Sequence, residues 1–311
     1  MRRPLILFLS LALAQAACRD RCSRAEPAEP ADDEDAAIKP VHYPMEVYGD
    51  PRIFSTPRLQ FAWRPTGEKD WTLWSIRLDG TDLRRVAKPE LLDRFNVNFG
   101  HTPVRSPDNR YVVAEADDLK RVLIDLKTQT ARVIGQGGTV PYFQWTEDSR
   151  AVIFYLNYEL RRYDLAKGKL EYIPMIYSRG LYVLRGSGNF LAVKDWGFVI
   201  HGPDGKELRS VTLGENLADF HAATPDGRLL MYHDGPYMVV IRTDDPEHPI
   251  YRGRRTPMDT AFGPEGKVLY FQYDGSIHKL NLSTRKVSLV FRSPGRWSVS
   301  DITLFNDRGA R

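Results

Sequence analysis

Residues 106–128 read SPDNRYVVAEADDLKRVLIDLKT, and this stretch contains the unit that decides the fold. A turn motif, Ser106-Pro107-Asp108-Asn109-Arg110, precedes an apolar strand that begins at Tyr111. A hairpin and a third strand follow and end in a polar turn at 125–128, after which comes a polar, variable segment. Asp, Asn and Gly suit such tight turns. The unit therefore predicts four short antiparallel strands, of which the fourth is an outer edge.

This unit recurs along the chain at a nearly constant period. The third positions of the turn motifs fall at 108, 148, 188, 226, 265 and 307, so that the intervals are 40, 40, 38, 39 and 42 residues. A period near 40 filled with short strands is typical of the four-stranded blades of a β-propeller. Helical solenoids share this period, but they need apolar residues spaced by 3.6, whereas these segments alternate by two.

The two ends of the repeated region complement each other. Residues 297–305, WSVSDITLF, resemble the innermost strand that precedes each turn motif, and residues 59–88 supply a second, third and fourth strand without a first. Pairing these fragments removes exposed sheet edges. We therefore predict an all-β, six-bladed β-propeller with four-stranded blades, closed by the C-terminal strand joining the N-terminal blade. Residues 45–54 are an alternative source of one further strand.

The N-terminal residues predict an exported protein. Residues 1–17, MRRPLILFLSLALAQAA, combine two arginines, a short apolar run and small residues, as a secretory signal peptide does. Residues 18–44 are poor in apolar residues and predict a disordered tether, which leaves 45–311 for the propeller. The expected location is the periplasm, or a membrane to which the protein is anchored as a lipoprotein, with the outer membrane as one option.

Cys18 has two interpretations. Ala16-Ala17-Cys18 resembles the end of a bacterial lipoprotein box, although Gln15 stands where such boxes usually have leucine. Acylation of Cys18 would anchor the protein to a membrane, whereas cleavage after Ala16 would leave Cys18 free to pair with Cys22 in an oxidising compartment. No cysteine follows Cys22, so the folded body depends neither on disulfides nor on thiolate metal sites.

Composition and charge restrict the function classes. Hydrophobic residues make up 42% and charged residues 27% of the 311 residues, which fits a soluble globular chain and argues against a multi-span membrane protein. The residues after 40 carry a net charge of about +5 without Lys/Arg-rich blocks. That charge is too small and too dispersed to favour a nucleic-acid partner.

The turn motifs are similar to those of a known family. Ser-Pro-Asp-Asn-Arg at 106–110 and Thr-Pro-Asp-Gly-Arg at 224–228, each before an apolar strand and a later Asp-Leu or Asn-Leu turn, resemble TolB-type WD-like β-propeller repeats. The resemblance covers roughly residues 58–305 and implies a six-bladed propeller that binds an envelope protein or a peptidoglycan-associated partner. The TolB N-terminal α/β domain cannot fit into residues 18–57, so we expect a propeller-only relative.

Four residues are candidates for binding at the channel mouth. His101, Asp219, Asp259 and Asp301 lie six or seven residues before the third position of their turn motifs, early in predicted innermost strands. The three carboxylates would form an acidic arc for a hard cation or for a Lys or Arg of a partner. The alternative is that they are ordinary strand-end residues.

Other candidates favour structural roles. His221 and His233 flank one hairpin and could approach each other, but the histidines show no metal-ligand spacing. Trp145 and Trp297 lie on innermost strands, where packing between blades is the default and stacking on a sugar the alternative. Arg252, Arg254 and Arg255 read most simply as a solvated basic face.

The expected function is a non-enzymatic binding scaffold in the cell envelope, with no catalytic residue and no cofactor. The rival hypothesis is a secreted, lyase-like carbohydrate-active enzyme with Ca or Mn in the channel. Oligogalacturonate-lyase-like propellers have a histidine-rich metal site there, but we match no residue of this chain to that site.

Overall fold

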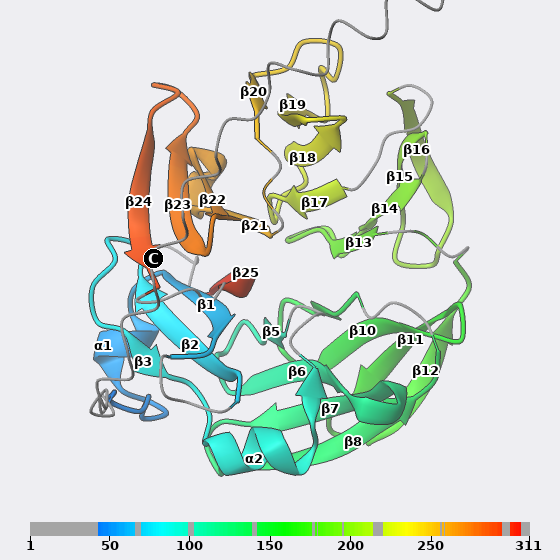
Figure 1. Ribbon diagram of the computed structural model, residues 1–311. Helices are drawn as coiled ribbons and strands as arrows, with labels where there is room; N and C mark the ends of the chain where they lie inside the picture. Colours follow the sequence, from blue (N-terminus) through cyan, green and yellow to red (C-terminus); the bar gives the residue numbers. More distant parts are fainter. Residues whose placement is uncertain are drawn as a thin grey trace, which may run out of the picture. The chain divides into compact units, whose positions relative to one another are not determined.

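A computed structural model describes residues 43–65, 70–98, 103–138, 142–175, 178, 180–194, 196–213, 220–255, 257, 259–293 and 299–305. They belong to one compact unit, Pro40–Arg311. The predicted signal peptide and Cys18 lie outside the described residues. Within this unit, six antiparallel sheets surround a common centre, as Figure 1 shows, and the predicted six-bladed propeller is confirmed.

Each blade has its innermost strand at the centre and its fourth strand outside. Blade 1 contains β25 (Ser300–Phe305), β1 (Arg58–Trp63), β2 (Thr72–Arg77) and β3 (Arg84–Arg85). Blade 2 contains β4 (Val97–Asn98) with β5 (Val104–Arg105), β6 (Tyr111–Ala116), β7 (Lys120–Asp125) and β8 (Thr130–Gln136). Blade 3 contains β9 (Gln144–Trp145), β10 (Ala151–Leu156), β11 (Glu159–Asp164) and β12 (Lys169–Ile173). Blade 4 contains β13 (Gly180–Val183), β14 (Phe190–Lys194), β15 (Gly197–His201) and β16 (Glu207–Thr212). Blade 5 contains β17 (Phe220–Ala223), β18 (Leu229–Asp234), β19 (Tyr237–Arg242) and β20 (Tyr251–Arg254). Blade 6 contains β21 (Thr260–Phe262), β22 (Val268–Tyr273), β23 (Ser276–Asn281) and β24 (Val287–Arg292).

Blade 1 closes the ring as the sequence predicts. Strand β25 pairs antiparallel with β1, with Arg58 opposite Phe305 and Leu59 opposite Leu304. The register shifts between Gln60 and Ala62, and this shift accompanies the left-handed backbone of Asp301 (φ 60°). The last strand of the described residues, β25, is therefore the innermost strand of the blade that contains the first three.

The hydrophobic core lies between neighbouring sheets. One cluster joins blade 1 to blade 6 through side chains such as Phe61, Trp63 and Ile277, and similar clusters join the other described pairs of blades. The second and third strands are mostly buried because both of their faces pack on other blades. The predicted outer strands are exposed, as β12 and β16 illustrate.

One turn motif is displaced from the sequence-based alignment. In blade 4 the N–H of Leu184 donates to the carbonyl of Asn189, as the N–H of Thr224 donates to Leu229 in blade 5. Gly186, and not Gly188, therefore occupies the third position. The expected alignment is wrong here because an apolar Leu184 stands where blades 2, 3 and 5 have Ser106, Thr146 and Thr224, so the hydroxyl that marks the start of those motifs is absent.

Residues 45–54, the alternative source of a further strand, add no blade strand. Met45 makes one parallel bridge to Arg85 at the outer edge of blade 1, and α1 (Pro51–Phe54) follows. The Glu46 carboxylate reaches the seam between blades 1 and 2, where it pairs with Arg105 at 2.5 Å. A second helix, α2 (Pro89–Arg94), and two short 3-10 turns, η1 (Asp117–Leu119) and η2 (Pro264–Gly266), occupy connections.

Candidate functional site: the central channel

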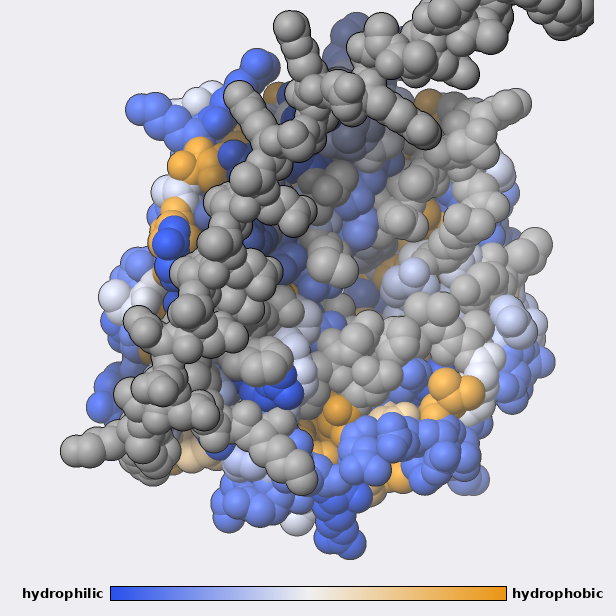
Figure 2. Space-filling view, viewed as in Figure 1, coloured by the Kyte–Doolittle hydropathy of each residue, from blue (hydrophilic) through white to orange (hydrophobic). Residues whose placement is uncertain are grey.

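The innermost strands of all six blades enclose a cavity of about 950 Å³. Its walls come from β5, β9, β13, β17, β21 and β25, which are far apart in the sequence and meet only because the ring closes. Figure 2 shows a hollowed face whose visible surroundings are mostly hydrophilic, with apolar residues in separate small patches. The cavity is therefore a concave surface of the size that ligand pockets usually have.

The middle of the channel is lined by equivalent positions of the six innermost strands, two residues before each turn begins. These residues are Val104, Gln144, Tyr182, Ala222, Ala261 and Thr303. Burial raises the pKa of the Tyr182 phenol, and the neighbouring Tyr142 adds to the effect. The phenol consequently stays protonated at neutral pH and is available as a hydrogen-bond donor.

Turn motifs form the lip of the channel, which we define as 106–107, 146–147, 184–185 and 224–225. Each Ser or Thr motif is fixed internally: in blade 3 the Thr146 hydroxyl donates to Asp148 at 2.7 Å and accepts from the N–H of Ala151 at 3.0 Å. Asp148 also accepts from the N–H of Arg150 at 3.0 Å. The Thr146 hydroxyl and this N–H hold the pKa of Asp148 below its usual value, so the turn keeps its charged acceptor.

Neighbouring turns of the lip are also joined to one another. The N–H of Asp108 donates to the Ser149 hydroxyl at 2.9 Å, and the N–H of Gly186 donates to the Glu147 carboxylate at 3.0 Å. The N–H of Arg185 donates to the carbonyl of Pro225 at 2.7 Å. These bonds link the lip across blades 2 to 5, so its shape is set before any ligand arrives.

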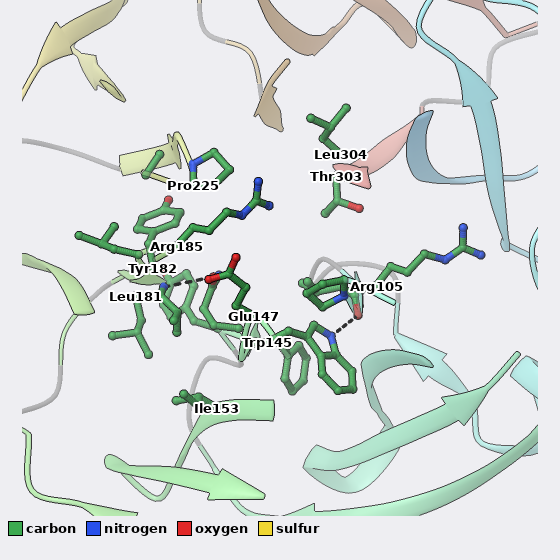
Figure 3. Close-up of a pocket in the computed structure, with 18 of the residues that line it drawn as sticks. Arg105, Trp145, Glu147, Ile153, Leu181, Tyr182, Arg185, Pro225, Thr303 and Leu304 are labelled. Carbon is green, nitrogen blue, oxygen red and sulfur yellow. Dashed lines mark hydrogen bonds between the residues drawn. The ribbon is translucent and has the colours of Figure 1, made fainter. Parts of the chain in front are cut away.

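Charged groups at the lip face the open centre. Figure 3 shows the side chains of Glu147 and Arg185 directed towards the middle of the channel, with the Thr303 hydroxyl on the opposite wall, whereas Arg105 points away from it. Glu147 and Arg185 are not among the binding residues predicted from the sequence. The only signal for them was their place in the turn motif, immediately after the innermost strand.

Of the four predicted channel residues, the structure describes Asp259 and Asp301. They occupy equivalent positions in blades 6 and 1, and the N–H of Asp301 donates to the Asp259 carboxylate at 2.9 Å. Burial raises the pKa of Asp259, and this hydrogen bond opposes the shift. Asp259 lines the channel, whereas Asp301 is almost fully buried, so their contact already has a structural role in joining the two blades. His101 and Asp219 lie outside the described residues.

His221 and His233 approach each other as expected, with ring centroids 4.2 Å apart. Within the described part of the chain, no three His, Cys, Asp or Glu side chains gather closely enough to share a metal ion. The described channel residues do not by themselves fit a Ca or Mn site, so we derive no chemical step through a metal.

Trp145 packs between blades 2 and 3, although it also borders the cavity. Its indole N–H donates to the carbonyl of Val104 at 3.0 Å, and its ring stacks on Tyr111 at 6.2 Å. This is the core role that we favoured. Trp297 lies outside the described residues.

Arg252 and Arg255 stand on the outer part of blade 5 and make different contacts. Arg252 pairs with Asp234 at 2.6 Å, and Arg255 lies over Tyr273. Among the described residues, no helix is both long and apolar enough to cross a membrane.

Comparison with known proteins supports the fold. No protein-family model matches the sequence, and no curated protein matches it. Among solved structures, TolB from Acinetobacter baumannii is similar with a TM-score of 0.60 and 17% identity, over 81% of this chain and 67% of that chain. A nidogen/laminin complex matches with a TM-score of 0.57 and 12% identity, over 80% of this chain and 98% of that chain.

An oligogalacturonate lyase in complex with manganese matches with a TM-score of 0.51 and 15% identity, over 80% of this chain and 78% of that chain. At such low identities these similarities establish a shared β-propeller architecture. Propellers carry many unrelated activities, so function has to be argued from the residues of this chain.

Proposed function

We propose that this protein is a non-enzymatic scaffold that binds an envelope protein or a peptidoglycan-associated partner at the lip of its channel. The observation that carries the proposal is the linked set of turns across blades 2 to 5, which presents Glu147 and Arg185 in fixed positions over a cavity of about 950 Å³. A rigid concave surface loses little conformational entropy when it binds, and charges of both signs at its edge favour a complementary protein surface.

Residues 1–17 support export, and Cys18 supports membrane anchoring if it is acylated. In that arrangement the residues from 18 up to Tyr43 act as a tether that sets how far the propeller reaches from the membrane. The predicted tether, 18–44, is too long at its end, because Tyr43 packs on Trp63 and Trp74 and the Pro44 carbonyl accepts from the N–H of Arg85. The similarity in fold to TolB is compatible with a periplasmic location.

Affinity capture from an envelope extract tests the proposal. We expect a partner that wild-type protein retains and that the Arg185→Glu variant loses by at least tenfold. Arg228→Glu is the matched control, because Arg228 belongs to the turn of blade 5, is 84% exposed and does not border the cavity. If every captured protein binds both variants equally, the lip is not the binding surface.

The rival function is a secreted, lyase-like carbohydrate-active enzyme with Ca or Mn in the channel. The observation in its favour is that His221 and Asp259 both border the cavity. Elemental analysis of purified protein separates the two hypotheses. A stoichiometric metal ion whose chelation abolishes saccharide binding would favour the enzyme and contradict the scaffold.

A further inference from the structure

Positive charge is concentrated in one sector of the propeller. Residues 251–293, which include β20 and blade 6, contain eight Lys and Arg but only three Asp and Glu, although the whole chain has a net charge of +4. Two of these acids are already engaged: Glu265 pairs with Lys267 at 2.5 Å, and Asp259 accepts the N–H of Asp301. Asp274 is left as the acid that could offset the positive charge of this sector.

Aromatic rings hold one of these cations in place. The guanidinium carbon of Arg255 lies 5.5 Å from the ring centre of Tyr273 and 5.8 Å from that of Phe271. The His278 imidazole stacks on the same Phe271 ring at 5.5 Å and meets Tyr273 edge to face at 6.3 Å. Because Phe271 is fully buried, the cluster stands on a rigid base.

A second cation approaches the cluster from β24. Arg292 of β24 lies opposite Ser276 of β23 in the antiparallel ladder. Ser276 precedes His278 by two residues on the same strand. Burial lowers the pKa of His278, and the charges of Arg255 and Arg292 lower it further. A hydrogen bond with the backbone of Tyr273 and the charge of Asp274 act in the opposite direction. Both guanidinium charges therefore lower the pKa of the His278 imidazole.

The nearby Arg252 is a cation of this sector whose charge is neutralised by a carboxylate. Arg252 lies 4.4 Å from the ring centre of Tyr237 and pairs with Asp234 at 2.6 Å. Among the described residues, neither Arg255 nor Arg292 has an acidic side chain within ion-pair distance. The aromatic support is thus present at Arg255, but the part of the chain that the structure describes provides no carboxylate like the one that accompanies it at Arg252.

We propose that Arg255, Arg292 and His278 form a binding site for a phosphate-type anion. Guanidinium groups bind phosphate oxygens through paired hydrogen bonds, and the stacked Arg255 loses little side-chain freedom when it does so. Protonated His278 would add a third donor, since an anion at this position stabilises the imidazolium. The site does not depend on the channel or on the proposed scaffold function.

Titration with inorganic phosphate, followed by calorimetry and by the NMR signals of the His278 ring, tests the site directly. We expect saturable binding that weakens at least tenfold in Arg292→Ala and in Arg255→Ala/Arg292→Ala. The control is Arg285→Ala/Lys286→Ala, which removes two exposed cations from the β23–β24 turn at the other end of the same hairpin. Equal loss in this control, or no loss in the Arg292 variant, would overturn the proposal. Arg292 is exposed, so its replacement leaves the fold intact.

Binding should also depend on pH through His278. Burial and the two guanidinium charges lower the pKa of the His278 imidazole, whereas a bound anion raises it, so phosphate binding should be accompanied by proton uptake at His278. Relative to the His278→Gln variant, which carries the same titration of phosphate itself, wild-type affinity should therefore increase as the pH falls. An identical pH profile in the His278 variant would contradict the role of the imidazole.

The source of the phosphate group is decided by a second arm. Sedimentation with vesicles of phosphatidylglycerol and phosphatidylcholine, compared with phosphatidylcholine alone, tests a lipid headgroup. Binding to the anionic vesicles that Arg292→Ala abolishes assigns the site to a membrane lipid. Binding of inorganic phosphate without vesicle binding assigns it to a soluble phosphate. Failure of both ligands to bind refutes the site.

Discussion

Replacement of Glu46 by leucine should destabilise the propeller strongly, although Glu46 belongs to no blade strand. Its carboxylate pairs with Arg105 at 2.5 Å, and the two side chains are only 3% and 1% exposed. Glu46 also accepts a hydrogen bond from the Ser75 hydroxyl, and Arg105 lies 4.1 Å from the ring centre of Phe305. The pair thus connects the N-terminal segment, blade 1 and blade 2 at the site of ring closure.

The size of the effect follows from the burial of Arg105. Glu46→Leu leaves a guanidinium without its counter-charge in an environment that excludes water, which costs about 3–5 kcal/mol of unfolding free energy. For a domain of this size, that loss lowers the melting temperature by about 6 to 20 °C. Urea unfolding followed by tryptophan fluorescence measures it, because Trp63 and Trp74 are fully buried in blade 1.

A double variant distinguishes charge burial from lost packing. Glu46→Leu/Arg105→Met removes both charges at once, and it should be more stable than Glu46→Leu alone because no buried charge is left unpaired. Glu265→Ala, at an ion pair whose side chains are 69% and 72% exposed, should change stability little. If Glu46→Leu unfolds at the wild-type urea concentration, or if the double variant is the less stable one, the electrostatic account of the seam is wrong.

Three further predictions test the closing blade, a turn and the N-terminus. Burial alone would raise the pKa of Asp82, but hydrogen bonds from Arg58 and Arg84 hold it below its usual value. The free energy of unfolding should therefore decrease as the pH falls from about 5 through that lowered pKa, and this decrease should be less steep in Asp82→Asn. Gly205→Ala should be more destabilising than Gly49→Ala in thermal unfolding. Both glycines have positive φ (84° and 86°), but only at Gly205 would the new Cβ lie 2.4 Å from a backbone carbonyl oxygen. Equal losses of stability would mean that the φ angle alone determines the effect. If Cys18 is acylated, wild-type protein should partition into detergent on Triton X-114 extraction and Cys18→Ser should not, whereas aqueous partitioning of both contradicts the anchor.

The repeated architecture could be predicted from the sequence because it depends on local signals. Turn residues such as Asp108 and Asp226 specify their own geometry through hydrogen bonds within five residues, and the turns recur at a nearly constant spacing. Ring closure was also predictable, since the strand missing from the first blade stood at the end of the chain. Where the local signal was absent, at Leu184, the alignment slipped by two residues.

The candidate sites could not be predicted in the same way, because they depend on contacts between blades. Glu147 faces the channel and accepts from Gly186 in the next blade, a relation that no spacing within one repeat reveals. Arg252 and Arg255 look alike in the sequence, and only the structure shows that one pairs with Asp234 while the other lies on Tyr273 without an acidic partner in the described part of the chain. Sequence periodicity therefore locates a residue within its blade, but the neighbouring blade decides what it can bind.

The two proposed surfaces lie at opposite ends of the blades, and this has a consequence for function. The lip is built from turns between first and second strands, such as 224–225, whereas Tyr273 ends a second strand and Arg292 pairs beside the start of a third. Because the second strand runs from one end of its blade to the other, a protein at the lip and an anion at Arg292 do not compete for space. Capture of the lip partner should therefore be unchanged by saturating phosphate, and Arg185→Glu should leave phosphate binding intact. Mutual exclusion would show that the two ligands share one surface, which this arrangement of strands forbids.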